Sequence, residues 1–164
     1  METKERIFKM ITLEDIKNNE EIRQLVIGAQ KQMNAIGYTE HSVRHVSLVS
    51  DRAASVLREL GYPEERIELA RIAGYLHDIG NCVNRTDHAH SGAILVYHIL
   101  KDMGMDIASR TDIMMAIGNH DEQTGTAVSD ISAALILAST SIGFSLKKDA
   151  TDTLGFLASA GLSA

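Results

Sequence analysis

The sequence predicts an all-α fold arranged as a single domain. Ala, Leu, Ile, Glu and Arg dominate the middle of the chain, whereas proline occurs once and aromatic residues make up only 4% of the sequence. A chain of 164 residues with 45% apolar composition is long enough for one substantial core and short for two independent domains. We therefore expect one helical bundle over residues 1–164.

Six segments carry apolar residues at helical spacing, and each is bounded by a capping residue, a proline or a glycine. Asn18 or Asn19 is the expected N-cap of the first helix, Thr39 that of the second and Ser129 that of the sixth. Residues 80–87 between the third and fourth helices are expected to form a loop. The expected helices cover residues 19–36, 39–60, 63–77, 93–103, 107–119 and 129–137.

The formal charge of −6 limits the binding partners we expect, and the single cysteine bears on the cellular compartment. An acidic chain offers no basic face to a nucleic-acid backbone, so we expect no DNA or RNA polymer as a partner, whereas small anionic substrates remain compatible. Cys82 has no internal disulfide partner, and the N-terminus lacks the apolar core of a signal peptide. No stretch reaches the ~20 apolar residues of a membrane span. We expect a cytoplasmic protein with no membrane partner.

Histidines and carboxylates gather at the ends of the expected helices. The apolar run 73–80 contains His77-Asp78, and this polar pair needs partners inside a core, either each other or a divalent cation. Further clusters lie at Glu40-His41 with Arg44 and His45, at Asp87-His88 with His90, and at residues 119–122. Imidazole together with carboxylate favours Fe, Mn, Zn, Co or Ni over Mg or Ca. Because helix ends of a bundle can converge on one pocket, we expect a transition-metal site.

Three segments resemble the HD-domain superfamily of metal-dependent phosphohydrolases, whose pattern is a first His, a His-Asp pair and a distal Asp on a helical bundle. Residues 38–44 (YTEHSVR) resemble the helix of the first ligand, residues 76–80 (LHDIG) the signature, and residues 88–93 (HAHSGA) the His-x-x-x-Gly-Ala element of two-metal members. The resemblance is strongest over residues 38–138. It implies an HD-type helical bundle in a single domain.

The resemblance also implies a set of site residues and a cofactor of one or two divalent ions of Fe, Mn, Co, Ni or Zn. His41 would be the first metal ligand, the His77-Asp78 pair would lie at the centre, and His88 and His120 would hold a second ion. Asp78 would bridge the two ions. The same resemblance gives catalytic roles to Asp78, His88 and His120.

Arg44 and Arg85 are the candidates for binding a substrate phosphate, with a solvated surface position as the alternative for each. His45 follows the first ligand by one turn, where relatives often carry an apolar residue, so we expect it to be a hydrogen-bonded neighbour of the site rather than a ligand. His90 is expected to face solvent or to support the site from outside. His98 is expected to be structural.

The sequence departs from the family pattern at the distal position, where Ser139 replaces the usual Asp. A neutral hydroxyl is a poor metal ligand at pH 7, so the site loses one negative donor. Asp130, Asp121 or water would take its place. Residues 140–164 lack the charged helix of relatives, and their apolar end, 151–164, either covers the core or contacts another subunit, which allows a homo-oligomer.

These observations predict a metal-dependent phosphohydrolase acting on a phosphate ester or anhydride of a small nucleotide or related metabolite. Two alternatives remain. One is a di-iron oxygenase on the same scaffold, and the other is a catalytically weak sensor domain that binds a metal or nucleotide, which Ser139 favours. Activity with added metal distinguishes them.

Overall fold

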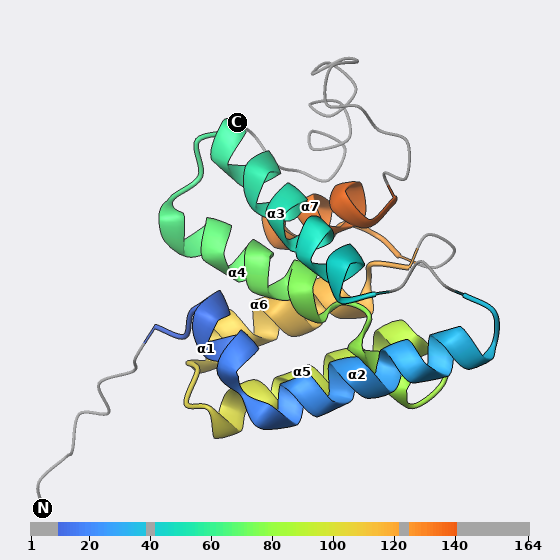
Figure 1. Ribbon diagram of the computed structural model, residues 1–164. Coiled ribbons are helices and arrows are strands. Elements are labelled where there is room, and N and C mark those ends of the chain that lie inside the picture. Colours follow the sequence, from blue (N-terminus) through green and yellow to red (C-terminus); the bar gives the residue numbers. More distant parts are fainter. Residues whose placement is uncertain (1–9, 39–41, 122–124, 141–164) are drawn as a thin grey trace, which may run out of the picture.

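In the computed structural model, the described residues are 10–38, 42–121 and 125–140, and they form helices with no strand among them (Figure 1). The helices are α1 (Leu13–Asn18), α2 (Glu20–Ala35), α3 (Val43–Glu59), α4 (Glu64–Leu76), the 3-10 helix η1 (Ile79–Cys82), α5 (His88–Asp102), α6 (Ile107–Gly118) and α7 (Asp130–Thr140). The all-α prediction is confirmed. None of these helices has the length and apolar character needed to cross a bilayer.

Most helix boundaries agree with the sequence, but α5 begins at His88 rather than at Ala93, and three further features differ. The capping box of Thr12 and Asp15 begins α1, which we had not predicted. Ser42 rather than Thr39 is the N-cap of α3, its hydroxyl accepting from the backbone N–H of His45 at 3.4 Å, so this helix starts later than expected. The expected loop 80–87 begins instead with η1.

Helices α3 and α4 form an antiparallel hairpin, and α7 lies across both of them and α6 (Figure 1). The hairpin is close because Gly74 has no side chain: a Cβ there would lie 2.7 Å from the Cα of Ser50. The apolar side chains of all seven α-helices and of η1 join one buried cluster. This shared core fixes the helix ends that carry the polar residues.

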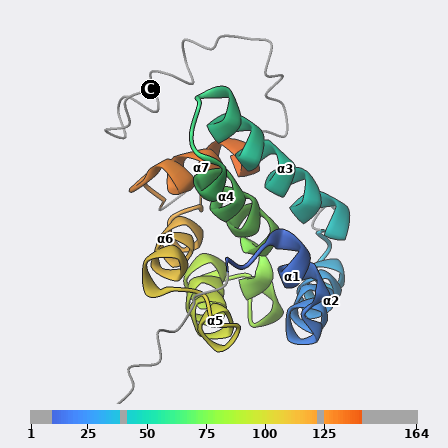
Figure 2. The same ribbon diagram turned by 90° about the vertical axis from the view of Figure 1, so that its left-hand side faces the viewer.

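A contact between two glycines brings α5 against η1. Figure 2 shows η1 between α2 and α5. A Cβ on Gly80 would lie 1.9 Å from the carbonyl oxygen of His88, and a Cβ on Gly92 would lie 3.1 Å from the backbone nitrogen of Gly80. The absence of both side chains therefore lets α5 begin directly beside the His77-Asp78 pair.

Arg66 ties α4 to α6 and α7. Its guanidinium donates two hydrogen bonds to the carboxylate of Asp130 and one, at 2.5 Å, to Asp112. Burial raises the pKa of Asp130, but the hydrogen bonds and positive charge of Arg66 outweigh burial and hold this pKa below its ordinary value. The ion pair fixes the N-terminus of α7 against the bundle.

Replacing Gly80 with Ala should lower the free energy of unfolding by about 1–3 kcal/mol and push the start of α5 away from η1, because the new methyl group meets backbone rather than a movable side chain. Chemical denaturation measures the loss. Gly28→Ala in α2 is the matched control, since its Cβ would meet the Cβ of Cys82 at 3.7 Å, an ordinary contact. Equal stability of the two variants would contradict this account of the glycine contact.

Replacing Asp130 with Asn should lower the free energy of unfolding by about 1–3 kcal/mol at pH 7, because Arg66 loses its charged partner. The folded-state pKa of Asp130 is lowered, so its stabilisation is present above the ordinary value of 3.8 and is lost as pH falls through the lower folded value. The difference in the free energy of unfolding between wild type and variant should therefore become smaller in acid.

Urea unfolding at pH 7 and near pH 3 measures this difference. The control is Lys101→Met, which removes an exposed charge on α5 far along the sequence from this ion pair. A difference that stays constant between the two pH values would show that the ion pair is not its source.

Candidate metal centre

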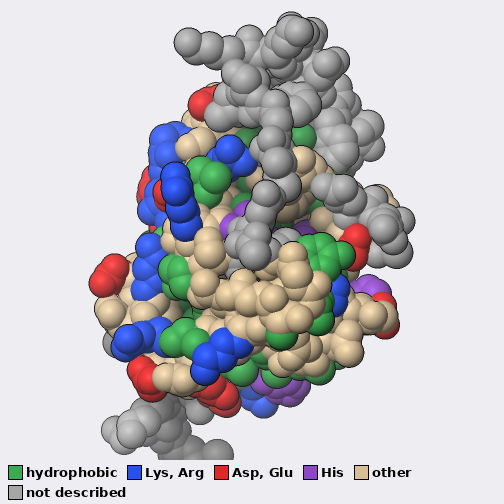
Figure 3. Space-filling model, turned by 45° about the vertical axis from the view of Figure 1, so that its right-hand side comes forward, with side chains coloured by type: hydrophobic (Ala, Val, Ile, Leu, Met, Phe, Trp, Pro, Cys, Tyr) green, Lys and Arg blue, Asp and Glu red, His purple; other side chains and the backbone are tan. Residues whose placement is uncertain are grey.

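Five polar side chains converge where α3, α4, η1, α5 and α6 meet. His77 and Asp78 join α4 to η1, His88 is the first residue of α5, His120 follows α6, and His45 lies in the first turn of α3. All but His45 are buried, with exposed fractions of 2% to 5%. Histidine side chains reach the surface near the middle of one face of the molecule (Figure 3).

The two carboxylate oxygens of Asp78 serve two different groups of imidazoles. Oδ2 lies 3.3 Å from Nε2 of His77 and 3.5 Å from Nε2 of His45. Oδ1 lies 3.6 Å from Nε2 of His88, whose own Nε2 is 3.3 Å from Nε2 of His120. Each group offers three ligand atoms, all within 4.8 Å of one another, and Asp78 belongs to both.

Backbone carbonyls fix the orientation of three of these imidazoles. In each case Nδ1 lies against the carbonyl three residues earlier: His77 on Gly74 at 2.7 Å, His88 on Arg85 at 3.2 Å, and His120 on Ile117 at 2.6 Å. A carbonyl only accepts, so Nδ1 carries the proton and the lone pair of a neutral ring is on Nε2. Metal-binding histidines are held in this way.

This arrangement fits a divalent cation. The neutral rings of His88 and His120 direct two Nε2 lone pairs at each other across 3.3 Å, and no proton is available to join them. A cation between them would satisfy both. Ligand bonds of ~2.0–2.2 Å around a four-coordinate ion place neighbouring ligand atoms roughly 3.3–3.6 Å apart, which agrees with the separations measured around Asp78.

Electrostatics divide the histidines into two classes. Burial, with the charge of His77 added, lowers the pKa of His120 to about 3, and burial and the charge of Arg85 lower the pKa of His88. Burial also disfavours the charged form of His77, but Asp78 outweighs it and the pKa of His77 is raised. His88 and His120 are therefore neutral ligands at pH 7, whereas Asp78 favours the protonated form of His77.

Asn81 is a part of the site that the sequence reading missed. It is fully buried in η1, and its amide donates to the backbone carbonyl of Asp78 at 2.9 Å and to Oδ1 at 3.2 Å. Its own oxygen accepts from Arg85 at 3.4 Å. Its position three residues after Asp78 was the available signal, because one turn of η1 separates the two residues, but the sequence did not predict this helix.

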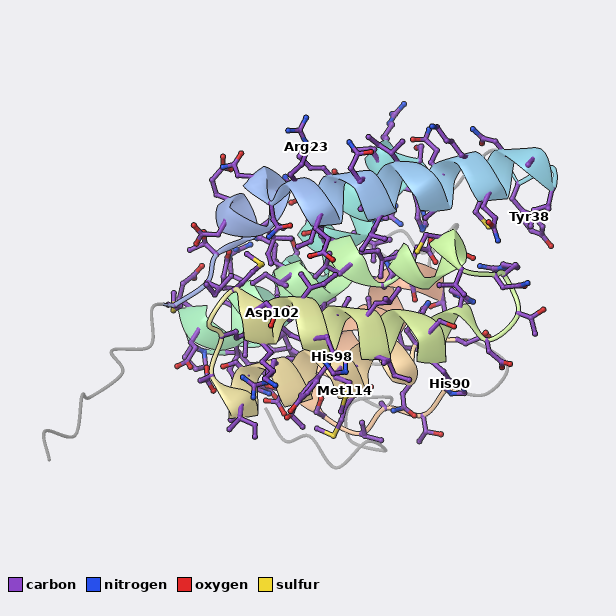
Figure 4. All side chains as sticks on the ribbon, turned by 90° about the horizontal axis from the view of Figure 1, so that it is seen from below. Arg23, Tyr38, His90, His98, Asp102 and Met114 are labelled. Atoms are coloured by element: carbon purple, nitrogen blue, oxygen red, sulfur yellow. The ribbon has the colours of Figure 1, made fainter. Side chains whose placement is uncertain are left out.

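The structure brings Arg85 to the site and leaves Arg44 on the surface. The Arg85 guanidinium is 3.5 Å from Nε2 of His88 and lies over the ring of Tyr38, 5.5 Å from its centroid. Arg44 is exposed in the first turn of α3. His90 and His98 are exposed on α5 (Figure 4), so the expectation of a solvent-facing His90 is confirmed.

Two expectations about the remaining ligands change. His41, the expected first ligand, lies outside the described residues, whereas His45, expected to be only a neighbour, reaches Asp78 with a potential ligand atom. Asp130 was a candidate for the distal position, and this is wrong because both its oxygens accept from Arg66. The hydroxyl of Ser139 donates to the carbonyl of Ile136 at 3.2 Å.

Comparison with known proteins agrees with these features. A family model for the HD domain matches residues 39–153, a range that includes all five converging side chains. An uncharacterized protein of Methanocaldococcus jannaschii is 29% identical, over 70% of this chain and 52% of its own length. The chain therefore spans about half the length of this curated relative.

The crystal structure of a predicted HD superfamily hydrolase from an uncultured Thermotogales bacterium is also similar. The TM-score is 0.57 at 24% sequence identity, and the match covers 78% of this chain and 71% of the other. At this identity the likeness concerns the fold.

Proposed function

The chain belongs to the HD-domain family, as the resemblance in its sequence indicated, and we propose that it is a metal-dependent phosphohydrolase. The proposed substrate is a phosphate ester or anhydride of a small nucleotide or related metabolite. The observation that carries this proposal is the sharing of Asp78 between two groups of imidazole ligands. We further propose that residues 1–164 form one domain.

The proposed ligands are those the described site offers, together with His41 from the family pattern. His77 and Asp78 would hold one ion, and Asp78, His88 and His120 the other. Nitrogen donors favour Fe, Mn, Co, Ni or Zn. When bound, such ions polarise a phosphoryl oxygen and lower the pKa of a water molecule toward 7.

The residues around the ligands are suited to a phosphate substrate. Arg85 holds a guanidinium beside His88, where it can donate two hydrogen bonds to a phosphate. Asn81 forms hydrogen bonds with both Asp78 and Arg85 and so holds the carboxylate and the guanidinium in place relative to each other. A small recess between α2 and α3, lined by Met33 and Val46 among others, reaches Asp78, and its volume of about 20 Å³ suits a single water molecule.

Hydrolysis in this site requires water to attack phosphorus on the side opposite the leaving oxygen. The new bond joins the water oxygen to phosphorus, the bond to the leaving oxygen breaks, and a proton passes to the leaving group. Asp78 would orient the attacking water, and His88 and His120 would hold a second ion. Arg85 offsets the charge on the equatorial phosphate oxygens.

The test is metal analysis of the purified chain followed by hydrolysis assays on nucleotides and sugar phosphates with Mn, Co, Ni, Fe or Zn. We expect stoichiometric metal and phosphate release. Asp78→Ala should abolish both and leave the helical circular dichroism spectrum near that of wild type, because the site lies at helix ends. Iron with dioxygen consumption and no phosphate release would favour the oxygenase, and metal without turnover would favour the sensor.

Replacing Arg85 with Met should raise KM or lower kcat/KM by about 10-fold or more, because a charge-assisted hydrogen bond to phosphate contributes about 1.5–3 kcal/mol. Metal content should stay at the wild-type level. Arg44→Met is the matched control, since it removes the same charge from an exposed position on α3. A larger effect at Arg44 than at Arg85 would reverse the assignment.

A further inference from the structure

His45 is positioned by its helix rather than by chance contact. Ser42 caps α3 and fixes its first turn, and the buried side chains of Val46 and Val49 set the rotation of the helix. This directs His45 toward the site, where its ring centroid is 5.4 Å from that of His77. Its Nε2 lies 3.5 Å from Oδ2 of Asp78.

Without His45, the group at Oδ2 would have too few donors among the described residues. His77 and Asp78 supply two ligand atoms there, and His45 supplies the third. Catalytic metal sites of this kind commonly use three protein ligands and keep a further position open. The side chain of His45 is 17% exposed, against 2% for His77, so it lies on the solvent side of the group.

The distal position leaves the site open to a donor besides those of the family pattern. The family resemblance places Ser139 where relatives carry a carboxylate, and the carboxylate of Asp130 is held by Arg66. Within the described part of the chain, Asp78 is the one carboxylate in either group. A site that has lost an anionic donor regains a ligand if a nearby side chain with a lone pair can reach the ion, and an imidazole meets this requirement.

We propose that His45 is a metal ligand of this chain, completing the ion site at Oδ2 of Asp78 with His77 and offsetting the absence of a carboxylate at position 139. The inference rests on the proposed metal centre. It assigns to His45 a direct bond to the ion, in contrast to a role limited to hydrogen bonding with Asp78.

The experiment uses Co²⁺ as the probe and the full chain freed of metal by a chelator. Titration gives the number of ions bound, competition with a chromophoric chelator gives their affinity, and the visible d–d absorption reports the ligands around cobalt. The variants are His45→Ala and His45→Gln. Gln keeps an N–H that can donate to Oδ2 of Asp78 and removes the imidazole lone pair.

We expect both variants to lose one Co²⁺ ion, or to bind it more than about 100-fold more weakly, which exceeds the usual effect of changing a supporting partner. Both should also lose the wild-type d–d spectrum. His98→Ala, which removes an exposed imidazole from α5, should match wild type in affinity and spectrum. Circular dichroism and thermal unfolding establish that the variants are folded.

Two results would overturn the inference. If His45→Gln keeps the wild-type affinity and spectrum while His45→Ala loses them, His45 only orients Asp78. If both variants match wild type, His45 has no role in this site. Failure of the proposed metal centre is a separate outcome, because wild-type protein would then bind no Co²⁺ at all, and failure of the proposed hydrolysis would appear only in the phosphate-release assay.

Discussion

The buried carboxylate of Asp78 is the constraint on which the rest of the site depends. A charge removed from water needs partners, and here three imidazoles lie within 3.6 Å of the carboxylate, while the ring of His120 lies edge-on against that of His77. Two of them, His88 and His120, remain neutral at pH 7 because burial opposes their charging. Neutral His88 and His120 add no positive charge near Asp78, and a divalent cation would supply it.

Close backbone packing makes this arrangement possible. His88 reaches Asp78 only because α5 starts against η1, and that start requires two residues without side chains, Gly80 and Gly92. The same approach places Asn81 under the carboxylate. The glycine that ends the LHDIG segment is thus as much a part of the site as the ligands are, although it donates nothing to them.

Local signals in the sequence predicted most of the fold, and long-range contacts account for what they missed. Asn19 and Ser129 cap helices where expected because capping is decided within three residues. Thr39 and Ser42 both suit the start of α3, and local sequence does not separate them. The direction of His45 in this first turn depends on the packing of α3 against α4 and α7, which local sequence does not contain.

Whether a buried carboxylate serves stability or metal binding depends on the positively charged side chain nearest to it in space. Asp130 and Asp78 are both largely buried, but Arg66, distant by 64 positions in sequence, donates to both oxygens of the first. No sequence pattern within α7 predicts the pairing of Asp130 with Arg66, so the sequence alone allowed Asp130 as a metal ligand. Asp78 meets imidazoles, and Asn81 links it to Arg85 by hydrogen bonds. One carboxylate thereby stabilises the bundle, and the other can offer its oxygens to a cation.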